Sequence, residues 1–210
     1  MARITLHSKC RLCRTEGMKL YLKGDRCLSA KCPVEKKGAV PPGMHGIKSH
    51  RKPTDYGIQL RAKQKAKRIY GIQEKQFKNY FITAKKLKGL VGDNLLSLVE
   101  RRLDNVVYLS GLALSRSHAK QLISHQNILV NGQSVNIPSY TVKINDLITL
   151  NHNIASKSGE LLKISEKDFK APTWMEINHS KYEVSVTALP QKDNFNPSID
   201  INLIIEYYSR

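Results

Sequence analysis

The fold of this chain is decided by a stretch that reads LVERRLDNVVY at residues 98–108, SRSHAKQLI at 115–123 and ILVNG at 128–132. The first two segments place apolar residues three and four positions apart, the spacing of helices that bury one face. The third is a short apolar run that ends in Asn-Gly, the strongest short signal for a hairpin. Together they predict a unit of helix, helix, hairpin and strand over residues 92–152.

Particular residues set the expected boundaries inside this unit. Asp93 is expected to cap the first helix and Gly111 to end it. Ser115 is expected to cap the second helix, and Asn127 to end it in a left-handed conformation. One continuous apolar stripe is expected on the first helix, formed by Leu95, Val99, Leu103, Val106 and Val107.

The net charge of the 210 residues, +18, comes entirely from the first part of the chain. Residues 1–90 contain 23 basic and 5 acidic side chains, a difference of +18, whereas residues 91–210 contain 12 of each. Nucleic acid is the commonest partner of so strong a field, because each neutralised phosphate releases counterions. A merely soluble basic surface would leave the mutual repulsion of these charges unrelieved.

Four cysteines lie in the first 45 residues as two close pairs, Cys10-x2-Cys13 and Cys27-x4-Cys32. Four thiolates at such spacing are typical of one structural zinc ion, to which a hairpin carrying Cys10 and Cys13 would present two sulfurs. They leave no ligand position open for a substrate. An iron–sulfur cluster on the same thiolates is the alternative. The residues between the pairs are mostly polar or charged, which disfavours a core of four buried thiols. The sequence therefore predicts a metal knuckle.

Other segments are expected to be helical, extended or irregular. The Pro/Gly-rich run 39–46 is expected to be irregular. Residues 54–90 show helical spacing among many lysines, and Gly71 is expected to separate two helices. Residues 181–189 are expected to form a strand, and the apolar segment 199–208 requires a partner surface.

Membrane insertion and secretion are not expected. No apolar run approaches the length of a membrane span, and the N-terminus lacks the apolar core of a secretion signal. We therefore expect a cytoplasmic protein with reduced cysteines and no membrane partner. No Gly-rich phosphate loop, paired-carboxylate pocket or nucleophile motif is present, so neither a small-molecule substrate nor an enzymatic activity is expected.

The stretch quoted first resembles the small RNA-binding module of the ribosomal small-subunit protein four family. The similarity continues in the same order along nearly the whole chain. The sequence is therefore identified as a bacterial-type member of that family in its four-cysteine form. The other matching segments are SKCRLCR at 8–14, PGMHG at 42–46, DYGIQLR at 55–61, RIYG at 68–71 and LIIEYYSR at 203–210.

The resemblance implies an α+β fold. A cysteine-rich metal knuckle and a helical domain would carry an inserted RNA-binding module of helices packed on an antiparallel sheet. The implied domains are the cysteine-rich segment 1–45, the helical domain 46–91 plus 190–210, and the module with its extension at 92–189, whose core is 92–152. The C-terminal segment would return to the helical domain and bury its apolar residues there.

The resemblance also implies a function. The chain would be a structural constituent of the small ribosomal subunit, a primary binder of 16S rRNA that nucleates subunit assembly in the cytoplasm. It would contact neighbouring small-subunit proteins, including a surface linked in the family to translational accuracy. It would also contribute to the mRNA entry channel, where Lys48, Arg51 and Lys52 would face the message.

Basic residues of the module are expected to read folded RNA through its phosphates and shape. Arg116 and Lys120 share one face of the second helix, four positions apart. For Arg101 and Arg102 the alternative is pairing with Glu100 or Asp104 on a solvated surface, and for Arg102 neither interpretation is favoured. The complete set of expected RNA-binding residues is Lys9, Arg11, Arg14, Lys48, Arg51, Lys52, Arg61, Lys63, Lys65, Lys67, Arg68, Lys85, Lys86, Arg101, Arg102, Ser115, Arg116, His118, Lys120 and Gln121.

Two other functions are open to a chain with this module. The module also occurs in pseudouridine synthases, and Arg102-Leu103-Asp104 is similar to their catalytic Arg-Leu-Asp. Against an RNA-modifying enzyme, Asp104 is expected inside a helix, and the remaining segments are too short for a catalytic domain. An RNA chaperone would need only the module and a tail, which leaves the cysteine segment and the long helices unexplained.

Overall fold

A computed structural model describes the chain at residues 8–46, 52–151, 172–178 and 180–210. Its elements are helices and one antiparallel sheet, so the predicted α+β class is confirmed. Within the described residues these elements are α1 (Lys9–Glu16), α2 (Asp25–Leu28), α3 (Pro33–Lys37), α4 (Asp55–Tyr70), α5 (Glu74–Lys86), α6 (Val91–Glu100), α7 (Leu103–Leu109), α8 (Arg116–Ser124), β1 (Ile128–Val130), β2 (Gln133–Ser134), β3 (Leu147–Leu150), β4 (Met175–Asn178), β5 (Glu183–Val186), η1 (Lys192–Asn194) and α10 (Ile201–Ser209).

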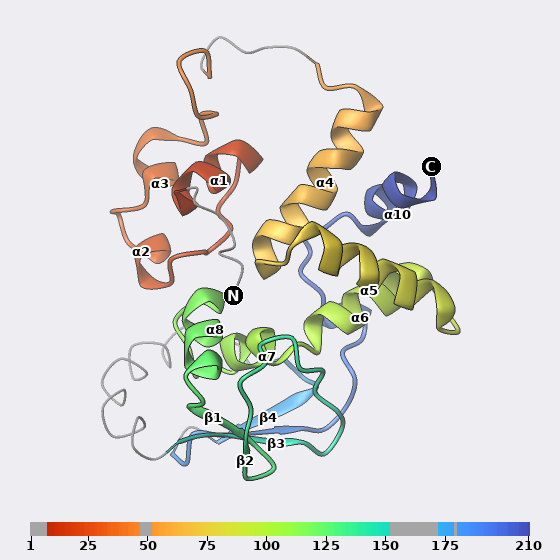
Figure 1. Cartoon of the computed structure of the whole chain (residues 1–210). Helices are drawn as coiled ribbons and strands as arrows, with labels where there is room; N and C mark the ends of the chain where they lie inside the picture. The colour runs from red at the N-terminus through yellow and green to blue at the C-terminus, as the bar shows by residue number, and fades with distance from the viewer. Residues whose placement is uncertain (1–7, 47–51, 152–171, 179) are drawn as a thin grey trace. The chain divides into compact units, whose positions relative to one another are not determined.

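The chain divides into two compact units, whose elements can be followed in Figure 1. The helical unit comprises residues 1–86 and 196–210, and it contains the cysteine-rich segment, α4, α5 and α10. The module comprises residues 87–195 and contains α6 to α8 and the sheet. The cysteine-rich segment and the helical segment, which the sequence separates at residue 45, thus belong to one unit.

Local residues start and end the helices of the helical unit. The hydroxyl of Thr54 accepts a hydrogen bond from the backbone N–H of Gly57 at 3.2 Å and so caps α4. Gly71 ends α4 in a left-handed conformation (φ 62°), which confirms the predicted break before α5. The C-terminal helix α10 packs on α4 and buries Ile204 completely.

The sheet of the module is antiparallel throughout, with strand order β2-β1-β3-β5-β4. Asn131 (φ 51°) and Gly132 (φ 79°) both have positive φ in the turn between β1 and β2, as the Asn-Gly signal predicts. Helices α7 and α8 cover one face of this sheet (Figure 1). Their shared core includes Val106, Val107, Ile123, Ile128, Ile148, Trp174 and Val184.

The single helix predicted after Asp93 is wrong, because the chain forms two helices, α6 and α7, with a break at Arg101 and Arg102. The backbone N–H of Leu103 donates to the carbonyl oxygen of Tyr140 at 2.8 Å instead of continuing the helix. A bridge between Arg102 and Thr141 fixes the same break. Non-local hydrogen bonds therefore override the helical periodicity here.

Three smaller expectations also differ from the structure. Asp93 lies in the first turn of α6, whose N-cap is Leu90. Gln126 rather than Asn127 takes the positive φ (59°) after α8. The Cys10–Cys13 pair lies on helix α1 rather than on a hairpin.

Candidate nucleic-acid interface

Exposed lysines lie along α5. Lys85 and Lys86, both expected to bind RNA, are exposed near its end. Lys75 and Lys78 are also exposed, and the sequence analysis did not select them. Their spacing of three and seven positions places Lys75, Lys78 and Lys85 on one helical face, a signal that the sequence contains.

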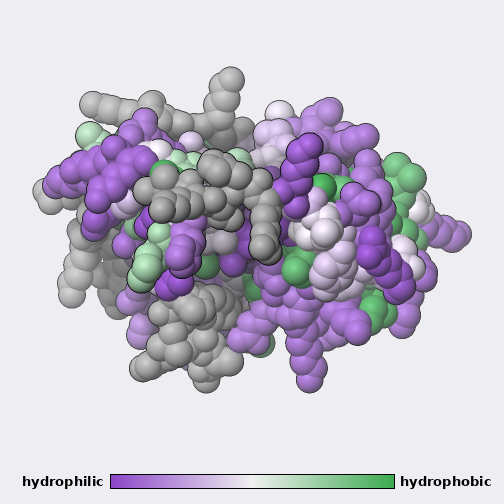
Figure 2. Space-filling view, turned by 90° about the horizontal axis from the view of Figure 1, so that it is seen from above, coloured by the Kyte–Doolittle hydropathy of each residue, from purple (hydrophilic) through white to green (hydrophobic). Residues whose placement is uncertain are grey.

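The surface of the described residues is mainly hydrophilic on the face that Figure 2 shows, and hydrophobic residues occupy small separate areas there. Arg11 and Lys52 are exposed, and Lys65 is half-buried. Lys48 and Arg51 lie outside the described residues. None of the described helices is both long enough and apolar enough to cross a membrane.

Glu16 holds two of the predicted RNA-binding arginines. Arg61 Nη2 lies 3.2 Å from Glu16 Oε1 and donates to the carbonyl oxygen of Thr15 at 2.7 Å. Arg68 also pairs with Glu16. Both arginines remain partly exposed, so each is anchored by protein and still reaches the surface.

Among the predicted RNA-binding residues of the helical unit, Lys63 differs most from the prediction, because it is buried. It is 4% exposed, its Nζ lies 2.8 Å from Glu74 Oε1, and it stands 4.1 Å from the centre of the Tyr207 ring. These partners enclose the ammonium group of Lys63, which disfavours the predicted contact of this residue with RNA. Lys67 Nζ lies 2.6 Å from Glu74 Oε2, and its side chain is also largely buried.

Arg14 connects α1 to the Pro/Gly-rich run that follows α3. Its Nε donates to the carbonyl oxygen of Val40 at 2.8 Å and its Nη2 to that of Pro41 at 3.2 Å. The run itself contains no regular helix or strand between residues 38 and 46, as predicted. Lys9 is half-buried. Exposed basic residues of the same segment that the sequence analysis did not select are Lys23, Arg26, Lys31, Lys36 and Lys37.

The four cysteines line one small pocket. Three of them are buried and Cys10 is partly exposed. Burial raises the pKa of the Cys13 thiol, and the three other thiols raise it further. Nevertheless, among the described residues no three His, Cys, Asp or Glu side chains are arranged to hold a metal ion. The pocket is lined by Cys10, Cys13, Lys23, Arg26, Cys27, Cys32, Pro33 and Val34.

Arg102 and Asp104 form a buried ion pair at the start of α7. Arg102 Nε donates to Asp104 Oδ1 at 3.0 Å and Nη2 to Oδ2 at 2.7 Å, and the two residues are 3% and 1% exposed. The structure contains the alternative, pairing of Arg102 with Asp104, and this burial disfavours the predicted contact of Arg102 with RNA. The pair is buried rather than solvated.

Lys120 of α8 joins this ion pair from the neighbouring helix. Its Nζ lies 3.4 Å from Asp104 Oδ2, and 22% of its side chain is exposed. Burial lowers the pKa of Lys120, and the positive charges of Arg102 and Arg116 lower it further, whereas Asp104 raises it. The ammonium group is thus fixed between a buried carboxylate and the surface.

Arg116, the first residue of α8, is held from two sides by α7. Its Nε donates to Asn105 Oδ1 at 2.8 Å, and its guanidinium lies over the Tyr108 ring at 4.4 Å from the ring centre. Asn105 in turn donates through Nδ2 to Glu100 Oε2 at 2.5 Å and to the Glu100 carbonyl oxygen at 3.0 Å. Asn105 and Tyr108 are not predictable as site residues from the sequence, because their roles depend on the packing of α7 against α8.

The remaining predicted residues of the module have mixed roles. The Ser115 hydroxyl accepts the backbone N–H of His118 at 3.2 Å, which confirms the predicted N-cap. His118 accepts a backbone hydrogen bond through Nδ1, and burial lowers its pKa. Arg101 Nε donates to the carbonyl oxygen of Val142 at 3.0 Å. Gln121 is exposed.

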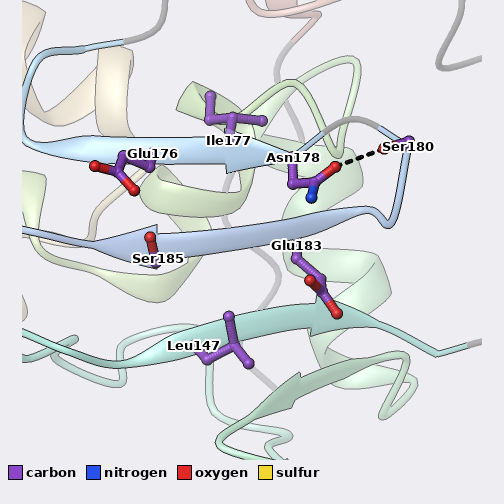
Figure 3. A pocket seen from close by; sticks show the side chains of 7 residues that line it. All are labelled: Leu147, Glu176, Ile177, Asn178, Ser180, Glu183 and Ser185. Carbon is purple, nitrogen blue, oxygen red and sulfur yellow. Dashed lines mark hydrogen bonds between the residues drawn. The ribbon is translucent and has the colours of Figure 1, made fainter.

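The opposite, open face of the sheet carries a shallow groove of different character (Figure 3). Glu183 on β5 and Glu176 on β4 place carboxylates on this face, and Leu147 of β3 is exposed beside them. Carboxylates repel phosphates, so this groove disfavours RNA. The basic side chains of the module that contact Asp104 or Asn105 lie at the start of α7 and on α8, the helices that cover the other face of the sheet.

Comparisons with known proteins agree along the whole chain. The profile described as "Ribosomal protein S4/S9 N-terminal domain" matches residues 5–100, and that described as "S4 domain" matches residues 101–148. "Small ribosomal subunit protein uS4" of Halothermothrix orenii is 50% identical over 203 residues, 96% of each chain. The protein of the same name from Syntrophomonas wolfei is 48% identical over 208 residues, 97% of each chain. "Small ribosomal subunit protein uS4A" of Clostridium acetobutylicum is 46% identical over 211 residues, 100% of each chain.

Proposed function

The chain belongs to the family of small ribosomal subunit protein uS4. From this membership we propose which of its residues bind rRNA and what each part of the chain contributes to the small subunit. The chain is a structural constituent of the small ribosomal subunit of the cytoplasm, it binds rRNA, and it is not an enzyme. Asp104, the residue that an enzymatic function would require, is buried against Arg102 and Lys120.

Two surfaces bind 16S rRNA in this proposal. The observation that supports the first is the fixed pair of Arg116 and Lys120 on α8, which presents two cations in one geometry. Such a surface recognises the shape of folded RNA through its phosphates. The exposed lysines of α5 form the second surface, and the exposed basic residues of the cysteine-rich segment add a long-range attraction that is strongly dependent on salt.

The contribution of α5 can be tested with the double variant Lys85→Gln/Lys86→Gln. We expect the slope of log affinity against log salt concentration to fall by about 1.4–1.8, since each phosphate contact contributes about 0.7–0.9. The measurement is binding of the full chain to 16S rRNA across a salt series. The matched control is Glu176→Gln/Glu183→Gln on the sheet groove, which changes two charges and is expected to leave the slope unchanged. An unchanged slope for the lysine variant would exclude Lys85 and Lys86 from the interface.

The finer roles that the resemblance implies are part of the same proposal. The chain nucleates subunit assembly, contacts neighbouring small-subunit proteins at a surface that affects translational accuracy, and contributes Lys48, Arg51 and Lys52 to the mRNA entry channel. The exposure of Lys52 just before α4 is consistent with the last role. Crosslinking from position 52 to mRNA in assembled subunits, with Lys75 as a position for comparison, tests it.

The cysteine pocket is proposed to hold one structural zinc ion, with Cys10, Cys13, Cys27 and Cys32 as its ligands. The chemistry of the donor set supports this proposal, because four thiols line one pocket and Lys23 and Arg26 would offset the negative charge of a tetrathiolate, although the thiols of the described segment are not themselves arranged as a ligand group. Zinc bound there would join α1 to the segment of α2 and α3 and would thereby stabilise the folded state. An iron–sulfur cluster on the same thiolates is the alternative.

Metal analysis of the full chain, purified under reducing conditions, tests the zinc site. We expect one zinc per chain, and a loss of zinc together with faster proteolysis of residues 8–46 in Cys13→Ser. Iron and visible absorption would instead identify a cluster. A chain without stoichiometric metal, whose proteolysis a chelator does not change, would rule out both.

A further inference from the structure

We propose that Asn105, supported by Glu100, positions the guanidinium of Arg116 for an rRNA phosphate. This inference rests on the proposed RNA-binding role of Arg116. It assigns a positioning function to two buried residues that do not themselves reach the surface. Asn105 is 1% exposed and Glu100 2% exposed.

The hydrogen bonds of Asn105 fix the orientation of its amide. Its Nδ2 donates to two oxygens of Glu100, the carboxylate Oε2 at 2.5 Å and the backbone carbonyl at 3.0 Å. Its Oδ1 accepts from Arg116 Nε at 2.8 Å. The reverse orientation would set the amide nitrogen against the guanidinium and the amide oxygen against the carboxylate, so every bond would be lost. Glu100 therefore determines that Asn105 offers an acceptor to Arg116.

The guanidinium is constrained in two independent directions. Asn105 holds it in its own plane through Nε, and the Tyr108 ring covers one of its faces at 4.4 Å. A planar fork held in this way has already lost much of the side-chain freedom that phosphate binding would otherwise remove. The three helices α6, α7 and α8 contribute Glu100, the Asn105–Tyr108 pair and Arg116, respectively.

The place of Arg116 in α8 supports a functional rather than a stabilising role. It is the first residue of the helix, where the positive end of the helix dipole disfavours a cation. Helix stability alone would favour an acidic residue there. The bond to Asn105 and the contact with Tyr108 keep the arginine at this position in a defined orientation.

A double-mutant cycle on the full chain tests the proposal, with 16S rRNA affinity measured across a salt series. Arg116→Ala is expected to weaken binding and to reduce the salt slope by about 0.7–0.9, because one phosphate contact is lost. Asn105→Ala is expected to weaken binding roughly 3–10-fold, the cost of ordering one long side chain, with little change in slope, because the charge remains. In the Arg116→Ala background Asn105→Ala is expected to have no further effect.

Tyr108→Leu provides a second route, since it removes the ring contact but keeps an apolar side chain that is only partly buried. It is expected to weaken rRNA binding with little change in the salt slope, as Asn105→Ala does. If Asn105→Ala does not fold, Tyr108→Leu tests the positioning of Arg116 in its place. Additive effects of Arg116→Ala with either partner variant would overturn the positioning role and leave RNA binding by Arg116 intact. An Arg116→Ala chain with unchanged affinity and slope would overturn both, whereas rRNA binding by the rest of the chain would still be measurable.

Discussion

Replacing Asp104 by alanine is expected to destabilise the module by about 3–5 kcal/mol, because one partner of a buried ion pair is removed while the other stays. Asp104 is 1% exposed and accepts two hydrogen bonds from Arg102, at 3.0 and 2.7 Å. Lys120 Nζ lies 3.4 Å from the same carboxylate. Without Asp104, Arg102 loses the carboxylate that accepts both of these hydrogen bonds, and Lys120 loses the charge that counters its own burial.

Urea unfolding followed by tryptophan fluorescence measures this effect in the full chain. Trp174 is the single tryptophan, it is 2% exposed, and it belongs to the core of the module, so its signal reports on that unit. The matched control is Arg102→Leu/Asp104→Leu. Replacing both partners by apolar residues is expected to cost less than the single change, because the buried guanidinium of Arg102 is removed together with Asp104 and only the partly exposed Lys120 loses a partner. Equal losses for the single and double variants would contradict this account of the pair.

Features set by a few neighbouring residues could be predicted from the sequence. Asn131-Gly132 requires a turn with positive φ at both positions, and Ser115 can cap only the helix that follows it. Gly71 can adopt the left-handed conformation that ends α4. In each case the conformation depends on backbone geometry and on hydrogen bonds within a few residues.

Features set by distant partners could not be predicted in the same way. The break between α6 and α7 depends on hydrogen bonds from Leu103 to Tyr140 and from Val142 to Arg101, about 40 positions apart in sequence. The apolar periodicity continues across this break, so it gives no local sign of it. Strand β4 is only four residues long and pairs with β5, and the sequence around it contains no strong strand signal.

The same distinction between local and distant partners applies to the candidate site. The sequence shows which residues are basic, but ion pairs with acidic residues such as Glu16 and Glu74 affect which of the basic ones reach solvent. Glu16 anchors Arg61 and Arg68, and Glu74 encloses Lys63. None of these partnerships is visible as a sequence motif, because they join α1 to α4 and α4 to α5. The sequence could therefore assign positive charge to a region of the chain. Which of its basic side chains are exposed depends on how the helices pack.

The C-terminal helix provides the second large expected effect. Tyr208→Ala is expected to destabilise the helical unit by about 3 kcal/mol, because it removes an aromatic side chain packed between two helices. The Tyr208 ring stacks on Phe81 with ring centres 4.8 Å apart and lies 6.2 Å from Phe77, and its hydroxyl donates to Glu74 Oε1 at 2.9 Å. Chemical unfolding followed by far-ultraviolet circular dichroism measures the loss, and Tyr208→Phe, which keeps the ring, is expected to cost about 1.5 kcal/mol.

The pH dependence of stability separates the hydroxyl bond from the ring packing. Partial burial alone would raise the pKa of Glu74, but hydrogen bonds from Lys63, Lys67 and Tyr208 outweigh it and lower the pKa to about 2. A carboxyl whose pKa is lower in the folded state stabilises the fold above its ordinary pKa, and this contribution is lost as the pH falls from about 4.5 to 2. The stability difference between the parent chain and Glu74→Gln should therefore be largest near neutral pH and should shrink across that interval.

Tyr208→Phe should weaken this dependence of stability on pH. Tyr208→Ala, which also removes the ring, should weaken it equally, since both variants lose the same hydrogen bond to Glu74. A parent chain whose stability relative to Glu74→Gln does not change between pH 5 and pH 2 would show that Glu74 does not couple α10 to α4 through its charge.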